Sequence, residues 1–245
     1  MSLNWKELEL ILSELPLEGS YIQKITEHSV SSFTFSLFSR TEKAFLFYVE
    51  VSTPYARVCR TDRIRKKDKR MQRFTQYMNA HTVGRKIERV WQYPYDRAFV
   101  MDLRSSENVL RMHIRLYSGP GANIIITDSE NTILELLYRR PGRHEEKGEK
   151  LFIEERTSEG ERKFSVRDYD TETFNEFIDK ASSIESSSER RKELEEKLKE
   201  KRDKELAILQ DRLSRQERRI KETALRRQNA LQICFQGQSG ALRRE

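Results

Sequence analysis

An acid and a base stand side by side near the middle of the chain. Asp96 and Arg97 closely follow Tyr93 and Tyr95 within the stretch of residues 84–103. The guanidinium fork of an arginine pairs with a phosphate or a base edge, and an aspartate orients the arginine or accepts a hydrogen bond from a base amine. A surface ion pair of little energetic weight is the simpler interpretation of the same two residues. Recognition of nucleic acid is the alternative.

A second group of candidate residues lies in a strongly basic segment. Between Arg57 and Arg73, nine of the 17 residues are basic and two are acidic. Lysines and arginines bind nucleic-acid backbones without reading the base sequence. A solvated loop leading into a helix over residues 69–79 is the plainer interpretation, with the apolar residues of that helix in the core. If the segment binds RNA, the candidate contacts are Arg57, Arg60, Arg63, Arg65, Lys66, Lys67, Lys69 and Arg70.

No combination of residues in the sequence indicates catalysis or a bound metal. The four histidines are scattered and lack the paired spacing of metal ligands. The nucleophile motif Gly-x-Ser-x-Gly, the Walker motif and the dinucleotide-binding fingerprint do not occur. We therefore expect no enzyme activity, no metal site and no cofactor. The histidines are His28, His81, His113 and His144.

The elements that must position these residues are predicted from hydrophobic periodicity. Apolar and polar residues alternate on both sides of Pro94, which predicts a β-hairpin packed against a core. Residues 84–90 match residues 19–25 at an offset of 65, and residues 122–128 match residues 56–62 at an offset of 66. A helical pattern precedes each copy. Because half of such a domain would leave an apolar face unburied, we predict an α+β fold with a pseudo-duplicated, β-rich domain.

Composition limits how much of the chain belongs to a core. Of the 245 residues, 36% are hydrophobic and 36% are charged, and the net charge is +7. Two distant cysteines form no disulfide framework, so a reducing cytosol is the default. The sequence shows no secretory signal and no apolar run near the ~20 residues of a membrane span. We expect a soluble, cytoplasmic protein with no membrane partner.

The composition changes along the chain and divides it into three parts. The middle part is polar, with possible short strands near residues 151–154 and 163–166, a short helix, and a serine-rich hinge at residues 182–188. The expected parts are a β-rich domain at residues 1–142, a polar linker with a short helix at 143–187, and the start of a coiled-coil arm at 188–245.

The predicted arm has a heptad pattern. Residues 188–227 hold 15 basic and 10 acidic residues, whereas residues 1–187 hold 30 and 29. The arm is expected to be half of a coiled-coil hairpin whose partner helix comes from a missing part of the chain or from a second copy. The sequence therefore looks like a fragment. The apolar residues at a and d positions are Leu206, Leu209, Leu213 and Ile220.

Five motifs, in this order and spacing, resemble the amino-terminal domain of the NFACT family. They are Gly19-x-Tyr-Ile-x-Lys-Ile, Pro54-Tyr-Ala-Arg57-Val, Gly84-Arg-Lys-Ile-Glu-Arg-Val, Asp96-Arg97 and Gly121-Ala-Asn123-Ile-Ile-Ile. The family includes bacterial proteins long labelled fibronectin-binding protein A, now understood as ribosome quality-control tailing factors. Its domain also resembles the amino-terminal fold of formamidopyrimidine-DNA glycosylases.

The resemblance implies a specific set of partners. It implies a factor that binds the large ribosomal subunit carrying peptidyl-tRNA and recruits charged tRNA, alanyl-tRNA in bacteria, for an untemplated tail. It implies tRNA binding by Asp96 and Arg97. This sequence departs from the family pattern at residues 119–123, where Gly-Pro-Gly-Ala-Asn replaces Gly-Arg-His-Ser-Asn, and at Gln76-Tyr77. A helix-hairpin-helix module and a carboxy-terminal RNA-binding domain are also not found. These departures count against the tailing activity more than against the binding of RNA or of the ribosome.

Two other classes of function remain as alternatives. One is a fibronectin- or matrix-binding adhesin, or a coiled-coil interaction protein, without an RNA partner. Its binding would be insensitive to salt, whereas phosphate contacts weaken steeply as salt rises. The other is a DNA-processing enzyme, but the glycosylases use an amino-terminal proline that Met1-Ser2-Leu3 does not supply.

Overall fold

The chain folds into two compact units. The computed structural model describes residues 2–53, 55–68, 70–153, 156–160 and 163–241. The first unit is Met1–Glu185 and the second is Ser186–Glu245. The first unit contains the sheet, helices α1 and α2, and the first turns of helix α3.

Helix α1 spans Trp5–Glu14, and its start is fixed by side chains. The Asn4 side chain accepts a hydrogen bond from the backbone N–H of Glu7, and the Glu7 carboxylate accepts one from the backbone N–H of Asn4. This is the capping box that the Asn-x-x-Glu spacing predicts. Leu8 and Ile11 of the helical apolar stripe are fully buried. The helix therefore packs by the face that its sequence period indicates.

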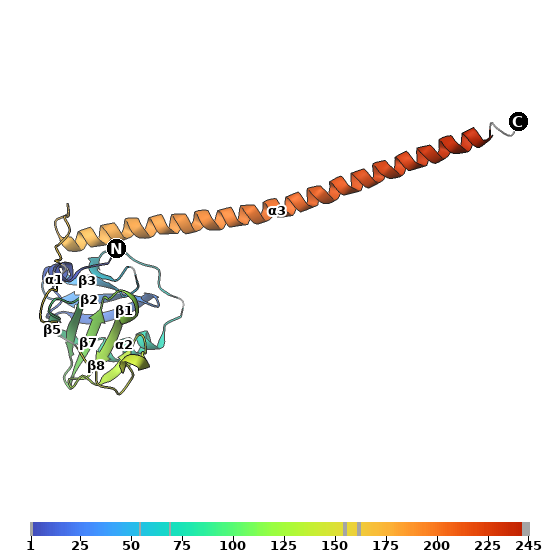
Figure 1. Cartoon of the computed structure of the whole chain (residues 1–245). Helices are drawn as coiled ribbons and strands as arrows, with labels where there is room; N and C mark the ends of the chain where they lie inside the picture. The colour runs from blue at the N-terminus through green and yellow to red at the C-terminus, as the bar shows by residue number, and fades with distance from the viewer. Residues whose placement is uncertain (1, 54, 69, 154–155, 161–162, 242–245) are drawn as a thin grey trace. The chain divides into compact units, whose positions relative to one another are not determined.

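The described residues contain one antiparallel sheet of nine strands, and Figure 1 shows how the sheet lies in the first unit. Its strand order is β4-β3-β2-β1-β5-β6-β7-β8-β9. Sequential strands pair as hairpins except at the crossing from β4 to β5, where α2 intervenes. The strands are β1 (Tyr21–Ser29), β2 (Ser32–Ser39), β3 (Lys43–Glu50), β4 (Arg57–Thr61), β5 (Lys86–Gln92), β6 (Ala98–Arg104), β7 (Val109–Arg115), β8 (Asn123–Thr127) and β9 (Ile133–Leu136).

The two hairpins that meet at the β1–β5 junction have matching registers. Ile22 pairs with Leu37 in the first, and Ile87 pairs with Leu103 in the second. Each register slips directly after that isoleucine. The structure confirms an α+β fold with a large antiparallel sheet and a long C-terminal helix. The pseudo-duplication and the glycosylase-like fold stay predictions.

One large core lies against the sheet, and the sheet curves around it. Helix α2, Arg73–Thr82, contacts both β1 and β9, which are far apart in the strand order. The Arg73 guanidinium also lies 2.7 Å from the Glu135 carboxylate of β9. A ten-residue helix can reach both strands only if the sheet bends toward it. The largest fully buried side chains are Phe33, Phe35, Phe47, Phe99 and Phe174.

The helix predicted over residues 69–79 begins later than its sequence pattern suggested. Helix α2 starts at Arg73, and the described residues between 62 and 72 form neither helix nor strand. The physical reason is that the backbone N–H of Asp68 and that of Gln72 are bound by Glu27 of β1 instead of by helical carbonyls. The basic residues therefore lie in a loop before the helix.

Residues 148–173, here called the strap, contain no strand in their described part, so the strands predicted near 151–154 and 163–166 are wrong there. Contacts to distant elements hold the strap instead of a β-ladder. Leu151 is buried against β8 and β9, and the Ser165 carbonyl accepts a hydrogen bond from the Asn4 side chain. Of the predicted linker at residues 143–187, the part up to residue 185 belongs to the first unit.

Helix α3 spans Phe174–Ala241, and residues 182–188, where a hinge is predicted, are helical and contain the boundary between the two units. The Glu14 carboxylate accepts hydrogen bonds from the backbone N–H groups of Phe174 and Asn175. An acidic group at this position satisfies free helical donors and complements the helix dipole. The buried side chains of Phe174 and Ile178 add apolar contacts.

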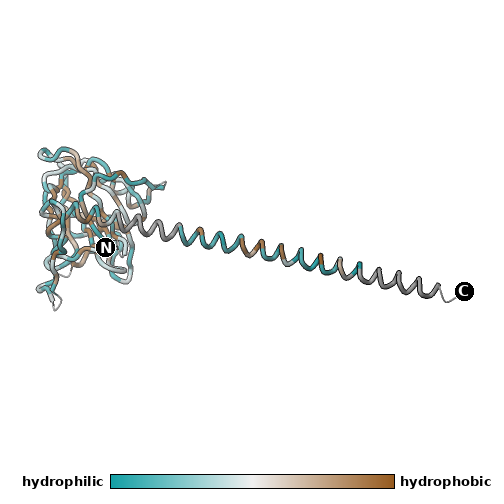
Figure 2. Tube along the Cα trace, turned by 90° about the horizontal axis from the view of Figure 1, so that it is seen from above, coloured by the Kyte–Doolittle hydropathy of each residue, from teal (hydrophilic) through white to brown (hydrophobic). Residues whose placement is uncertain are grey.

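The described part of the second unit is the rest of α3. Apolar positions are interspersed among hydrophilic ones along it (Figure 2). The four predicted heptad residues, Leu206, Leu209, Leu213 and Ile220, are exposed. Pairing of this helix with another stays a prediction. Among the described residues, no helix is long and apolar enough to cross a membrane.

Candidate functional site

The turn between β5 and β6 holds Asp96 and Arg97 at the edge of a pocket. Tyr95 has a left-handed backbone with φ of 54°, and the backbone N–H of Asp96 donates to the Tyr93 carbonyl at 3.1 Å. The Gln92 side chain donates to the Asp96 carbonyl at 2.8 Å. These bonds give the turn a defined shape, so the two charged residues have fixed directions.

Asp96 is 7% exposed and binds three groups. One carboxylate oxygen accepts the backbone N–H of Arg97 at 2.7 Å, and the other accepts the Tyr117 hydroxyl at 2.5 Å. An Nη of Arg156 lies 4.0 Å from the first oxygen. Burial, together with the Asp96 carboxylate, raises the pKa of Tyr117 above its usual value, so the hydroxyl remains a donor. Asp96 thus fixes the backbone of Arg97.

The Arg97 guanidinium is half-buried and has neutral partners. It donates to the Leu3 carbonyl at 3.4 Å and to the Ser118 hydroxyl at 3.2 Å. No ion pair in the described part of the chain includes it. Burial lowers the pKa of Arg97 from its usual value, yet an arginine remains charged in proteins. The simple surface ion pair between neighbouring side chains is therefore not what the structure contains.

The pocket beside this turn has a volume of about 1500 Å³ and is rich in arginine. Two of its arginines are neutralised. Arg115 lies 2.5 Å from Glu145, and Arg167 lies 2.5 Å from Glu7. The other three leave the pocket with more positive than negative charge. The arginines that line the pocket are Arg97, Arg115, Arg143, Arg156 and Arg167, and the carboxylates are Glu7, Asp96 and Glu145.

The basic segment divides into a paired half and an exposed half. In the paired half, Arg57 and Arg65 lie over the Tyr48 ring, with their guanidinium carbons 5.4 and 3.7 Å from its centre. Arg57 also binds Glu50 at 2.8 Å. Burial raises the pKa of Tyr48 to about 12. These two arginines are therefore engaged within the fold.

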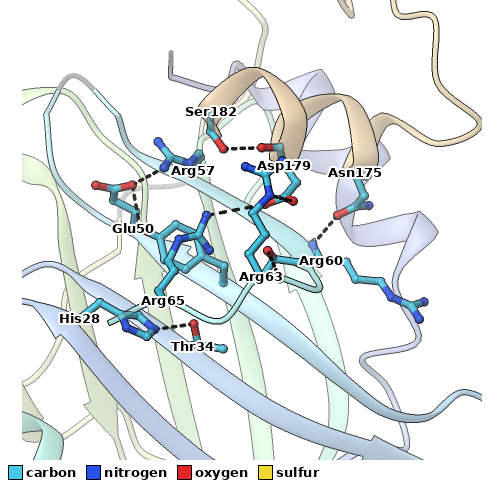
Figure 3. A network of polar contacts seen from close by, with 12 residues as sticks. His28, Thr34, Glu50, Arg57, Arg60, Arg63, Arg65, Asn175, Asp179 and Ser182 are labelled. Atoms are coloured by element: carbon cyan, nitrogen blue, oxygen red, sulfur yellow. Dashed lines mark hydrogen bonds and ion pairs between the residues drawn. The ribbon is translucent and has the colours of Figure 1, made fainter. Parts of the chain in front are cut away.

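Arg60 and Arg63 are the other two arginines of the paired half, and each lies close to a carboxylate. Arg63 lies 3.0 Å and Arg65 lies 3.6 Å from the Asp179 carboxylate in the first turns of α3. Arg60 binds Glu42 at 3.1 Å. Figure 3 shows Arg57, Arg63 and Arg65 converging below α3, with acidic partners on two elements. This cluster fastens the start of α3 to the sheet.

The exposed half consists of Lys66, Lys67 and Arg70, while Lys69 lies outside the described residues. The loop that carries them is anchored by His28 of β1. A ring nitrogen of His28 contacts the Lys66 carbonyl at 2.9 Å, and its other nitrogen contacts the Thr34 hydroxyl at 2.7 Å. Burial lowers the pKa of His28. The two lysines and Arg70 thus extend into solvent from an anchored loop.

The pocket and the basic segment are separate sites. None of the described residues predicted in the basic segment lines the pocket. The pocket's other arginines were missed by sequence reasoning because Arg143, Arg156 and Arg167 lie in a polar stretch without periodicity. The described residues contain no cluster of three or more His, Cys, Asp or Glu side chains that could hold a metal.

Comparisons with known proteins agree with this fold. A structure of the N-terminal part of the fibronectin/fibrinogen-binding protein from Streptococcus suis is similar, with a TM-score of 0.58 and 21% identity over 64% of this chain and 62% of that chain. The fibrinogen-binding protein from Staphylococcus aureus gives 0.55 and 15% over 64% and 58%. The chain thus spans about three fifths of both. At such identities, the likeness concerns the fold alone.

The N-terminal domain of the fibronectin-binding protein PavA from Streptococcus pneumoniae is also similar, with a TM-score of 0.57 and 18% identity over 75% of this chain and 81% of that chain. No curated protein matches the chain in sequence. A family model described as "NFACT N-terminal and middle domains" matches residues 7–147, which is more than half of the chain and includes the Asp96-Arg97 turn. The chain therefore belongs to the NFACT family, as the five sequence motifs indicate.

Proposed function

We propose that this chain acts in ribosome-associated quality control. In this proposal it binds the large ribosomal subunit carrying peptidyl-tRNA and recruits a charged tRNA, alanyl-tRNA in bacteria, for untemplated C-terminal tailing. Membership of the NFACT family supports the class of function, because these are the partners that the family resemblance implies. The cytoplasm, where ribosomes work, is the proposed location.

The position of the Arg97 guanidinium is the observation that carries the proposal. It lies at the wall of a positively charged pocket, donates to the Leu3 carbonyl and the Ser118 hydroxyl, and has no ion pair among the residues that the structure describes. A guanidinium with neutral partners keeps its charge available for a phosphate, and partial burial strengthens the attraction. Arg97 therefore suits a phosphate or a base edge of tRNA.

Asp96 is proposed as a positioning residue for Arg97. Its carboxylate holds the backbone N–H of Arg97 and the Tyr117 hydroxyl, so it sets the direction in which the Arg97 side chain leaves the turn. Peptide transfer belongs to the ribosome in this proposal. The factor therefore needs recognition and orientation, and no nucleophile or general base is assigned to it.

The proposal is tested by measuring binding of fluorescently labelled total tRNA to the chain at several salt concentrations. We expect Arg97→Ala to weaken binding about tenfold, because one charge-assisted contact contributes about 1.5 kcal/mol or more. The matched control is Arg104→Ala, which removes an exposed arginine, paired with Glu88, at the other end of β6. Equal affinities of the two variants would contradict the assignment.

The same assay separates the adhesin alternative from the RNA-binding proposal. RNA binding weakens steeply between about 50 and 200 mM salt, because phosphate contacts release counterions. An adhesin would retain purified fibronectin after nuclease treatment and at high salt. Sequencing of the RNA that co-purifies with the chain from cells identifies the bound species. Enrichment of tRNA, lost in an Asp96→Ala, Arg97→Ala double variant, is the expected result.

A further inference from the structure

We infer that Arg156 of the strap is a second phosphate-binding residue of the pocket and that Phe152 gives a base of the same RNA segment a surface for stacking. The ligand is a single-stranded segment of RNA that enters the pocket. This inference rests on the proposed function, since it concerns the same site. It adds two residues of the strap to the proposed tRNA-binding site.

The geometry places Arg156 beside the Asp96-Arg97 turn. Its Nη lies 4.0 Å from the Asp96 oxygen that also accepts the backbone N–H of Arg97. The Arg156 side chain is 62% exposed. A long ion pair of an exposed side chain contributes little energy, so Arg156 can turn toward a stronger partner at small cost. The Asp96 carboxylate thus contacts the Arg156 guanidinium and the backbone of Arg97 at the pocket wall.

The excess of positive charge in the pocket favours an anionic ligand. Of its five arginines, Arg115 and Arg167 are bound to Glu145 and Glu7 at 2.5 Å. The lining then has three further arginines, Arg97, Arg143 and Arg156, and one further carboxylate, that of Asp96, which leaves an excess of positive charge in a concave site. Such a site concentrates anions. A phosphate between Arg97 and Arg156 would give each guanidinium a closer anionic partner than it has within the fold.

Size and an exposed aromatic side chain favour a nucleic-acid strand over a small metabolite. The pocket volume of about 1500 Å³ exceeds the roughly 300–1,000 Å³ of common small-molecule sites. Phe152 lines the pocket although it is 86% exposed. A cationic groove with an exposed aromatic ring is the usual combination for single-stranded nucleic acid, in which unpaired bases stack on the ring.

The strap lies beyond the part of the chain that the family model covers. That match ends at residue 147, whereas Phe152 and Arg156 follow it. The strap is nevertheless held firmly at Arg167, which donates to Glu7 through three nitrogen atoms. The family match therefore includes the Asp96-Arg97 turn but not the two strap residues of this inference.

The test uses the full chain and three labelled probes: total tRNA, single-stranded poly(U) and an RNA duplex. We expect Arg156→Ala to weaken tRNA and poly(U) binding about tenfold and to reduce the salt slope by about 0.7, the value for one contact to a single strand. Arg156→Lys keeps the charge and should keep the slope. Phe152→Ala should weaken poly(U) binding with the slope unchanged, because stacking releases no counterions.

The matched control is Arg139→Ala. Arg139 has a similar exposure of 60%, pairs with Glu146 and does not line the pocket. If Arg156→Ala binds all three probes as Arg139→Ala does while Arg97→Ala is weakened, this inference is overturned and the proposed function stands. If Arg97→Ala is also unchanged, both fail. Thermal unfolding of each variant confirms that the domain is folded when it is assayed.

Discussion

Arg167 in the strap holds the Glu7 carboxylate through its backbone N–H at 3.2 Å and two guanidinium nitrogens at 2.5 and 2.9 Å. The same carboxylate accepts the backbone N–H of Asn4 and so completes the cap of α1. Glu7 is 1% exposed. One buried acidic group therefore ties the first helix to the strap, and the strap forms a wall of the pocket.

Replacement of Glu7 should destabilise the domain strongly. Glu7→Ala leaves the Arg167 cation without its carboxylate and removes the half of the capping box that the Glu7 side chain makes with the Asn4 backbone, so we expect a loss of about 3 kcal/mol in the free energy of unfolding. Chemical denaturation measures it. Glu9→Ala removes an exposed glutamate from the same helix and should change stability by less than about 0.5 kcal/mol. Similar losses in both variants would show that Glu7 does not join the two elements.

Replacement of Asp179 should loosen the start of α3. Asp179 faces Arg63 and Arg65 and is 14% exposed, so Asp179→Ala leaves two arginines without their acidic partner. We expect a loss of about 2 kcal/mol in unfolding free energy and faster hydrogen exchange in residues 174–182. Glu176→Ala, one turn earlier and exposed, is the control. Unchanged exchange in Asp179→Ala would rule out a fastening role for the cluster.

Stability should fall as the solution becomes acidic, and His113 should account for much of this. The His113 ring is buried between the Tyr93 and Thr127 hydroxyls, and burial lowers its pKa from 6.5 to about 3. The unfolded chain therefore binds a proton that the folded chain does not bind between these values. Stability contributed by neutral His113 is complete above pH 6.5 and is lost as pH falls toward 3.

Urea denaturation at pH 7 and pH 5 measures this effect. One such histidine predicts a loss of about 2 kcal/mol over that interval. His113→Gln should be less stable at pH 7 but should show a smaller change between the two pH values. The exposed His144 provides the comparison, and His144→Gln should behave like the unsubstituted chain. An equal change in His113→Gln would assign the acid sensitivity to other groups.

The exposed half of the basic segment should contribute to RNA affinity. Lys66→Ala combined with Lys67→Ala removes two solvated charges on the loop held by His28, so we expect the salt slope of tRNA binding to fall by about 1.5. Arg60→Ala, from the same segment but paired with Glu42, should leave the slope nearly unchanged. A slope that stays constant in the lysine variant would restrict RNA contact to the pocket.

A methyl group at Gly121 should disturb the pocket by displacing the Tyr117 side chain. A Cβ at this position would lie 2.7 Å from a ring carbon of Tyr117, whose hydroxyl holds Asp96. We expect Gly121→Ala to lower the unfolding free energy by about 1–3 kcal/mol and to weaken tRNA binding. Gly142→Ala meets nothing within 4 Å and serves as the stability control. Unaltered tRNA binding would show that the hydrogen bond from Tyr117 to Asp96 is not needed for tRNA binding.

The sequence by itself determined the first helix, the β5–β6 hairpin and the family. The Asn4–Glu7 spacing predicted the cap of α1, and the alternation around Pro94 predicted the β5–β6 hairpin, because helix period, strand period and turn chemistry are local properties of the chain. The motifs predicted the NFACT family, which the family match confirms. The serines of residues 182–188 predict a hinge from local composition alone, whereas the structure has a helix that continues through them.

Only the tertiary structure decided which charges are available to a partner. Arg65 and Lys66 are neighbours of the same charge, yet Arg65 faces Asp179 while Lys66 is exposed. Arg167 is bound by Glu7 from 160 residues away. Ion pairs of this kind join residues without any spacing rule, so no local pattern identifies them. The pocket arises from these long-range contacts, because a concave surface exists only after the strap, the turn and the sheet have packed together.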